Sequence, residues 1–194
     1  MAHKRKSRSK LIPWNKGKQV GQKLPLSLQQ IRAIRSRLKA AEKPRELALF
    51  DLAIDSSLCA TDLVRLRVRD IARGRRVLSR VTITQIETKL PLQFEMTAPT
   101  RVSIARWIAH KALNANHYLF PTRLHASPYI SVRQYARLIE TWVGGIGLDA
   151  RLYGTESLRR TKPLLIYRRT KNLRAAQLML RHVKLESTVR YLDV

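Results

Sequence analysis

Apolar residues recur along most of the chain at the spacing of amphipathic helices. After Ser27, which is placed to form a capping box with Gln30, they follow every three or four positions as far as Ala41. A second helix is expected from Pro44 to about Ser56, and its residues are almost all apolar. This second helix should therefore lie at the centre of the core.

The same periodicity predicts further helices downstream, and one segment breaks it. Thr61 and Asp62 should cap a short helix that runs through Val68. Later helices are expected over residues 99–113, 131–143, 155–169, 173–182 and about 187–191. Between residues 77 and 97, apolar and polar side chains alternate around a turn-like stretch at Thr88–Pro91, which predicts a β-hairpin. The expected fold is mainly α with this hairpin as its only clear β structure, an α+β class.

Composition narrows the classes of function that the chain could have. The 194 residues suit one domain, and 39 Lys and Arg against 13 Asp and Glu give a net charge of +26. Such a charge predicts a polyanionic partner, with nucleic acid the first choice. The single cysteine, Cys59, excludes an internal disulfide and a cysteine-based metal site. No apolar run is long enough to span a membrane and no secretory signal follows the start, so a soluble cytoplasmic protein without membrane contact is expected.

The basic charge is densest at the N-terminus. Residues 1–24 carry eight Lys and Arg, and no acidic residue precedes Glu42. With so few apolar residues, we expect residues 1–26 to form a flexible basic arm, and residues 27–194 to form the folded domain. The arm should contact the DNA backbone without base specificity, through Lys4, Arg5, Lys6, Arg8 and Lys10. A solvated tail that only aids solubility is the alternative.

The last forty residues place three chemically distinctive side chains on successive short helices. These are Arg159, His182 and Tyr191. An arginine binds two phosphate oxygens with its planar fork, a histidine donates a hydrogen bond, and a tyrosine phenol can attack phosphorus. Arg160 and Lys162 add positive charge beside them and are expected to contact DNA. The segment therefore predicts chemistry on a phosphodiester.

The order and spacing of these residues resemble the catalytic domain of tyrosine recombinases, the phage integrase family. That family carries His-x-x-Arg, then Leu-Gly-His, then a tyrosine nine residues later. Here the motifs read Glu156-Ser157-Leu158-Arg159 and Leu180-Arg181-His182, followed by Tyr191 at the same separation. The resemblance implies that Tyr191 is the nucleophile, that Arg159 and His182 hold the scissile phosphate, and that a 3′-phosphotyrosyl intermediate forms. It also implies that no metal or other cofactor is needed.

Three positions depart from the family pattern. The stretch Ser57–Leu63 resembles the family's Gly-Leu-Arg-x-Ser-Glu-Leu, which places Cys59 where the first catalytic arginine belongs. Glu87 stands where the family has a lysine on the hairpin, and Glu156 where it has the first histidine. Because alternate residues of a strand share a face, Lys89 is a possible substitute acid for the leaving oxygen.

Two features of the C-terminal helices also depart from the family. Pro163 falls inside the helix that carries Arg159, and Arg181 replaces a glycine at a helix end where a left-handed backbone is favoured. Together with the three substitutions, these features suggest reduced catalysis.

The resemblance implies a site-specific DNA recombinase or integrase that acts on double-stranded DNA, with impaired catalysis. Its partners would be DNA and further recombinase protomers, of its own or another kind, in the bacterial nucleoid. The alternative is a DNA-binding protein of the same fold that no longer cuts DNA and acts as a regulator or partner of an active recombinase. A third hypothesis, an RNA-binding or ribosome-associated protein, agrees with the charge but is disfavoured by the motif order.

Overall fold

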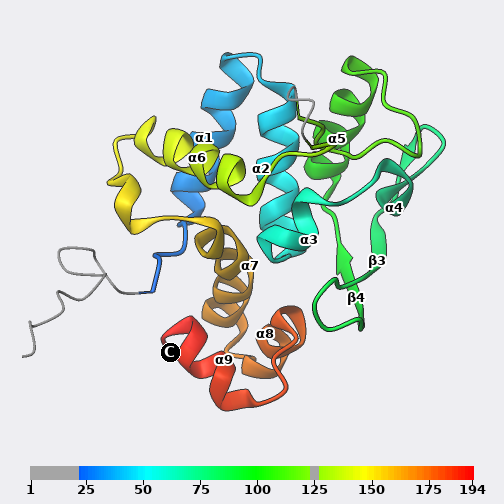
Figure 1. Cartoon of the computed structure of the whole chain (residues 1–194). Helices are drawn as coiled ribbons and strands as arrows, with labels where there is room; N and C mark the ends of the chain where they lie inside the picture. Colours follow the sequence, from blue (N-terminus) through cyan, green and yellow to red (C-terminus); the bar gives the residue numbers. More distant parts are fainter. Residues whose placement is uncertain (1–21, 123–126) are drawn as a thin grey trace, which may run out of the picture.

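The computed structural model describes residues 22–122 and 127–194, which fold mainly into helices (Figure 1). The helices in chain order are α1 (Leu28–Ala40), α2 (Pro44–Ser56), α3 (Ala60–Val64), α4 (Val68–Ile71), α5 (Ala98–His110), α6 (Val132–Gly144), η1 (Ala150–Leu152, a 3₁₀ turn), α7 (Thr155–Thr170), α8 (Leu173–Leu180) and α9 (Leu185–Leu192). The strands are β1 (Ala72–Arg73), β2 (Arg76–Val77), β3 (Arg80–Thr84) and β4 (Pro91–Glu95). The predicted fold class, mainly helical with a small antiparallel β part, is confirmed.

Helix α2 forms the centre of the domain. All ten of its residues from Leu47 to Ser56 are buried, and it packs against α1, α5 and α7. This position follows from the apolar sequence of α2, because a helix that is hydrophobic on all sides must be covered on all sides. The buried Asp51 is tolerated since Arg35 of α1 donates to its carboxylate over 2.6 Å.

The predicted start of α1 is confirmed in detail. Ser27 Oγ accepts from the Gln30 amide at 3.2 Å, and Gln30 Oε1 accepts from the Ser27 amide at 2.8 Å. This capping box satisfies two backbone donors at the start of the helix.

The expected helix through Val68 is wrong in its extent. Helix α3 begins at Ala60 with Cys59 as its N-cap residue and ends at Val64, and α4 starts separately at Val68. Asp62 does not cap the helix. Its buried carboxylate instead accepts from the Ile86 amide at 2.9 Å and from the Cys59 thiol at 3.1 Å. These bonds connect α3 to the hairpin turn.

The predicted hairpin is present but shorter than expected. Strands β3 and β4 pair antiparallel, from Arg80 opposite Glu95 to Thr84 opposite Pro91. A second antiparallel pair, β1 with β2, was not predicted, because two residues per strand give no readable alternation. Gly74, with φ of +58°, lies in the turn between β1 and β2.

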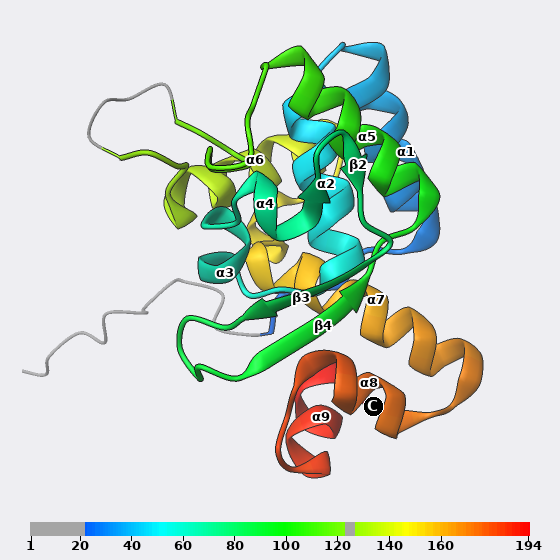
Figure 2. The same cartoon turned by 90° about the vertical axis from the view of Figure 1, so that its right-hand side faces the viewer.

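Helix α7 connects the main body to a smaller C-terminal unit. Leu158, in its first half, belongs to the main core. Leu164, in its second half, packs with Ala176, Leu180 and Leu192 in a separate cluster, which we call the C-terminal cluster. Figures 1 and 2 show α8 and α9 gathered at this end of the molecule, below the β3–β4 hairpin.

The segment just before α1 contacts later elements of the chain. Leu26 is buried, and its amide donates to Thr161 Oγ1 at 3.0 Å, while the Leu24 amide donates to the Leu152 carbonyl at 2.9 Å. Leu24 and Leu26 therefore contact η1 and α7, and the division into an arm and a folded domain at residue 26 stays a prediction. The arm residues Lys4, Arg5, Lys6, Arg8 and Lys10 lie outside the described residues. Among the helices that are described, none is long and apolar enough to cross a membrane.

Candidate functional site

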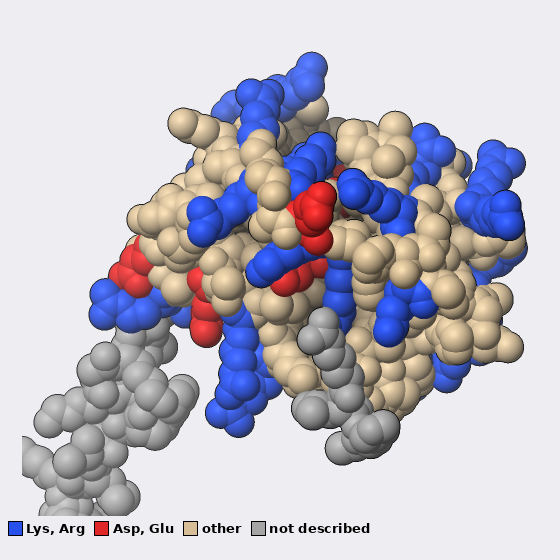
Figure 3. Space-filling model, turned by 90° about the horizontal axis from the view of Figure 1, so that it is seen from above, with Lys and Arg blue, Asp and Glu red and all other residues tan. Residues whose placement is uncertain are grey.

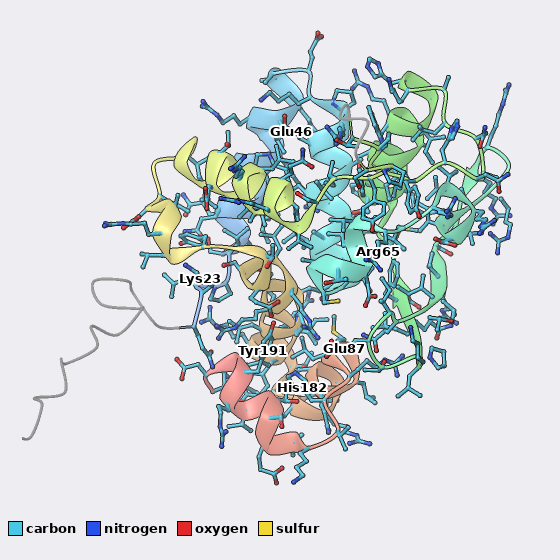
Figure 4. All side chains as sticks on the ribbon, viewed as in Figure 1. Lys23, Glu46, Arg65, Glu87, His182 and Tyr191 are labelled. Carbon is cyan, nitrogen blue, oxygen red and sulfur yellow. The ribbon has the colours of Figure 1, made fainter. Side chains whose placement is uncertain are left out.

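Three elements bring Arg159, His182 and Tyr191 together. Arg159 lies on α7, His182 follows the end of α8, and Tyr191 lies on α9. The Arg159 guanidinium carbon is 5.8 Å from the centre of the Tyr191 ring, and the His182 ring meets that ring edge-on at 5.1 Å. Figure 4 shows Tyr191 on α9 and His182 in the segment between α8 and α9, both close to α7. The helical spacing of the sequence thus produces one compact group of side chains.

The position of His182 depends on a sharp turn after α8. Arg181 has a left-handed backbone with φ of 59°, the conformation that favours glycine and that the sequence indicated at this helix end. A non-glycine residue there costs about 1–2 kcal/mol. Gln177 stabilises the turn, because its side-chain amide donates to the carbonyls of His182 and Val183 at 2.8 and 3.1 Å.

Tyr191 is half-buried and surrounded by charged groups. Its hydroxyl donates to Glu156 Oε2 at 2.5 Å, and the Arg160 guanidinium lies 5.4 Å from the ring centre. Burial raises the pKa of Tyr191, and the bond to Glu156 raises that pKa further. The phenol is therefore protonated at neutral pH.

His182 is uncharged at neutral pH. Burial holds the pKa of His182 below its usual value, and the Arg159 charge lowers that pKa further while Glu156 opposes the change. His182 Nδ1 is 3.1 Å from Thr188 Oγ1. In the tautomer where the Thr188 hydroxyl donates to Nδ1, Nε2 carries the proton and is the donor available to a ligand.

Arg159 has capacity for an anion. Its nearest ion-pair partner is Glu156 Oε2, 3.9 Å from Nη1, and 21% of its side chain is exposed. Its Nε is buried and has no hydrogen-bond partner among the described residues. A buried donor without a partner is unfavourable, so Arg159 keeps hydrogen-bonding capacity that no described residue uses.

Arg160 and Lys162, which the sequence assigned to DNA contact, bond to the protein instead. Arg160 is 4% exposed, and its Nη1 donates to the Lys23 carbonyl at 2.8 Å. Lys162 Nζ donates to the carbonyls of Asp55 and Glu95 at 2.8 and 3.2 Å, and burial lowers the pKa of Lys162. In this arrangement both cations connect elements around the site, and a DNA contact by either residue stays a prediction.

Cys59 lies near the same group. The thiol is half-buried at the N-terminus of α3 and bonds to Asp62. Burial raises the pKa of the Cys59 thiol, and the positive charge of Arg159 opposes that rise, so the two residues are within electrostatic range. A thiol at this position supplies no positive charge to a phosphate.

Glu87 and Lys89 are exposed in the turn between β3 and β4, and neither is on a strand. Lys89 has a left-handed φ of 58°, and its amide donates to the Gln85 carbonyl at 3.1 Å. The argument that Lys89 shares a strand face with Glu87 is therefore wrong, because alternation holds only for extended backbone. The role of Lys89 as a substitute acid stays a prediction.

The sequence of the chain matches a known protein family. The sequence profile of the phage integrase family matches residues 25–194, most of the chain. The chain belongs to that family. A curated relative from Bacillus subtilis (strain 168), the "Probable integrase/recombinase YoeC", is 26% identical over 168 residues, which are 87% of each protein.

Solved structures of recombinases share the fold. XerA recombinase superposes with a TM-score of 0.73 at 15% identity, over 90% of this chain and 60% of XerA. XerH bound to its difH substrate gives 0.71 at 15% identity, over 86% and 50%, and a lambda integrase dimer bound to a COC′ core site gives 0.67 at 14%, over 91% and 49%. This phage integrase family chain thus spans about half to three fifths of these solved proteins.

Two features of the site were missed by sequence reasoning. Asp62 occupies the glutamate position of the family's Gly-Leu-Arg-x-Ser-Glu-Leu stretch, so the resemblance contained a signal for a carboxylate beside Cys59. The docking of Gln22 and Lys23 near Tyr191 had no such signal. Gln22 Nε2 donates to the Arg190 carbonyl at 2.6 Å, a contact across 168 residues.

Proposed function

We propose that this chain is a tyrosine-type DNA recombinase or integrase that cuts one strand of duplex DNA through Tyr191, with catalysis slowed by its substitutions. One observation carries the proposal. Arg159, whose buried Nε has no hydrogen-bond partner in the described part of the chain, lies with His182 around the hydroxyl-bearing ring of Tyr191. An anion receptor beside a nucleophile is what phosphoryl transfer needs.

In the proposed reaction, the scissile phosphate contacts Arg159 and His182, whose donors stabilise the extra negative charge of the transition state. As the Tyr191 phenol gives up its proton to a base, its oxygen bonds to phosphorus and the bond to the 5′-oxygen breaks, which leaves a 3′-phosphotyrosyl link and a 5′-hydroxyl. The leaving oxygen takes a proton from Lys89, the proposed substitute acid, or from water. The link keeps the energy of the phosphodiester, so a second strand can be joined without another energy source.

Duplex DNA as the partner is supported by charge and by the relatives. The net charge of +26 favours a polyanion. Figure 3 shows Lys and Arg spread over the face of the molecule opposite α8 and α9. XerH and lambda integrase are described in complexes with DNA. We propose further recombinase protomers as protein partners, and association with the nucleoid in a bacterial cytoplasm.

Slow catalysis is proposed because Cys59 stands where the family has a catalytic arginine, whose charged guanidinium can bind two phosphate oxygens. Loss of one preorganised donor to an oxyanion lowers the rate by about 10²–10³-fold. The second candidate is a DNA-binding regulator of an active recombinase that does not cut DNA itself. It is favoured by Cys59 together with the exposed turn positions of Glu87 and Lys89.

The test begins with duplexes that the protein selects from a random DNA library. Each selected site is rebuilt with a nick just 3′ of the candidate phosphate, so that the cleaved fragment diffuses away and the covalent product accumulates. We expect a slow, denaturant-resistant adduct that Tyr191→Phe abolishes. Salt-sensitive binding without any adduct would support the regulator and contradict the enzyme.

A further inference from the structure

We infer that Glu156 is a catalytic residue of this chain, the group that takes the proton from Tyr191 as the phenol attacks phosphorus. The inference rests on the proposed function. It gives Glu156 a role of its own in the reaction, whereas a charge beside the phosphate would only oppose binding. The direct contact between this carboxylate and the reacting oxygen carries the inference.

The geometry is that of a base and its nucleophile. Glu156 Oε2 accepts a hydrogen bond from the Tyr191 hydroxyl at 2.5 Å, the short distance typical of a hydroxyl bonded to a carboxylate, so a proton can pass directly between the two oxygens. The two residues are 35 positions apart and lie on α7 and α9, so the contact is set by the packing of these helices. Because the pKa of Tyr191 is raised, the phenol needs an acceptor to attack at neutral pH.

The other neighbours of the phenol are poorer acceptors. Arg159 and Arg160 approach the Tyr191 ring from α7, and a guanidinium has no acceptor atom. His182 meets the ring edge-on, and its Nδ1 is engaged with Thr188. Glu156 is therefore the best-placed acceptor among the described residues.

The surroundings suit a carboxylate that takes and releases a proton. Glu156 is in the first turn of α7, where a negative charge is favoured by the helix dipole, and Arg159 Nη1 is 3.9 Å from the accepting oxygen. The Glu156 side chain is 43% exposed, so the proton can pass on to water. The nearby carboxylate of Asp193, two positions after Tyr191, interacts electrostatically with Arg160.

Glu156 accepts a proton during cleavage and returns it during rejoining. As the bond between the Tyr191 oxygen and phosphorus forms, the phenol proton moves to Glu156 Oε2, and the bond from phosphorus to the 5′-oxygen breaks. The 5′-oxygen takes its own proton from Lys89 or water. In rejoining, a 5′-hydroxyl attacks phosphorus and gives its proton to neutral Lys89 or to water, the bond from phosphorus to the Tyr191 oxygen breaks, and the protonated Glu156 returns its proton to the departing phenolate.

The experiment compares two forms of the nicked duplex, one with the normal 5′-oxygen and one with sulfur at that bridging position. A thiolate leaves without a proton donor, because thiols are far stronger acids than alcohols. Glu156→Gln keeps the shape and removes the basicity, and Glu156→His supplies a different base. The matched control is Glu186→Gln, an exposed glutamate in the first turn of α9.

We expect Glu156→Gln to lower adduct formation at pH 7 by about 10²-fold or more on both substrates, since a general base contributes about 10²–10⁴-fold. The loss should shrink as pH rises towards 10, because the small phenolate fraction of Tyr191 grows with the hydroxide concentration. Glu156→His should stay active at pH 8 and lose activity below about pH 6, as imidazole becomes charged. Glu186→Gln should match the unmodified protein.

The outcomes that overturn the inference are distinct. Adduct formation by Glu156→Gln at or above the unmodified level would show that the carboxylate blocks the site. If Glu156→Gln formed the adduct normally on the sulfur substrate alone, Glu156 would instead be the group that protonates the leaving 5′-oxygen. Should Glu156→Gln fail to fold, an activity of Glu156→His that does not respond to pH would overturn the inference equally. If the unmodified protein formed no adduct on either substrate, the proposed cleavage itself would be refuted, and with it the role of Glu156 as a base.

Discussion

Replacing Cys59 with arginine should increase strand cleavage more than any other single change. The new side chain would begin at the N-terminus of α3, within electrostatic range of Arg159. Its guanidinium would give the scissile phosphate a second charged fork, which a thiol cannot. Cys59→Arg thus tests whether the missing charge is what limits the reaction.

The size of the effect follows from two opposing terms. Two neighbouring guanidinium groups repel by a few kcal/mol at an effective dielectric constant of about 20. Asp62 offsets this repulsion, because its buried carboxylate already contacts the residue-59 side chain and a hydrogen bond to a charged group contributes about 1.5–3 kcal/mol. The new guanidinium would then stabilise mainly the negative charge on the phosphate in the transition state. We expect adduct formation to rise by about 10²–10³-fold, which corresponds to a barrier lower by about 2.7–4 kcal/mol.

The assay is the initial rate of adduct formation on a nicked duplex, with Cys59→Ala and Cys59→Lys as controls. Alanine should give no increase, and lysine a smaller one than arginine, because an ammonium acts as a point charge without the planar fork. Melting temperatures and DNA affinity of each variant show whether the fold and binding survive.

An unchanged rate in a folded, DNA-binding Cys59→Arg variant would refute this reasoning. In that case residue 59 would not contact the phosphate, and the placement of the family's first arginine on this position would be wrong. Adding Tyr191→Phe to the active variant must abolish the adduct, since any remaining product would come from another nucleophile.

Four further results are expected. DNA affinity should fall steeply between about 50 and 200 mM salt, by a slope near 0.9 per phosphate contact, and a flat titration would contradict the charge argument. Removal of residues 1–21 should weaken binding to all duplexes alike with little change in melting temperature, because seven positive charges are lost. Pro163→Ala should stabilise the domain against denaturant by roughly 1–2 kcal/mol, since the regained hydrogen bond to the Arg159 carbonyl exceeds the loss of proline rigidity. Because the pKa of His182 is lowered in the fold, the unfolded chain takes up a proton first as pH falls below about 6.5. The free energy of unfolding should therefore decrease there, and His182→Asn should remove that decrease.

Local patterns in the sequence predicted much of the fold. The capping box at Ser27, the apolar α2 and the short C-terminal helices depend on neighbouring residues, so spacing alone identified them. The spacing of Arg159, His182 and Tyr191 on those helices also indicated one site.

Contacts between distant segments were not predictable in this way. The Gln22 bond to the Arg190 carbonyl joins residues 168 positions apart, and the Tyr191 bond to Glu156 depends on how two helices pack. Lys89 is not a strand residue because it lies within the turn that its residue types indicate, where strand alternation does not apply. Periodicity describes one element at a time and carries no information on which elements meet.

The small size of the C-terminal cluster should allow the site to open locally. His182 and Tyr191 lie on a unit whose buried apolar residues are only Leu164, Ala176, Leu180 and Leu192 among the described residues, apart from the main core. A unit with so little buried surface opens locally at a lower free energy than the whole domain. Amide hydrogens of α8 and α9 should therefore exchange faster than those of α2, and DNA that binds only the closed form should slow that exchange. DNA binding would then increase the fraction of molecules in which His182 and Tyr191 are held in place beside Arg159.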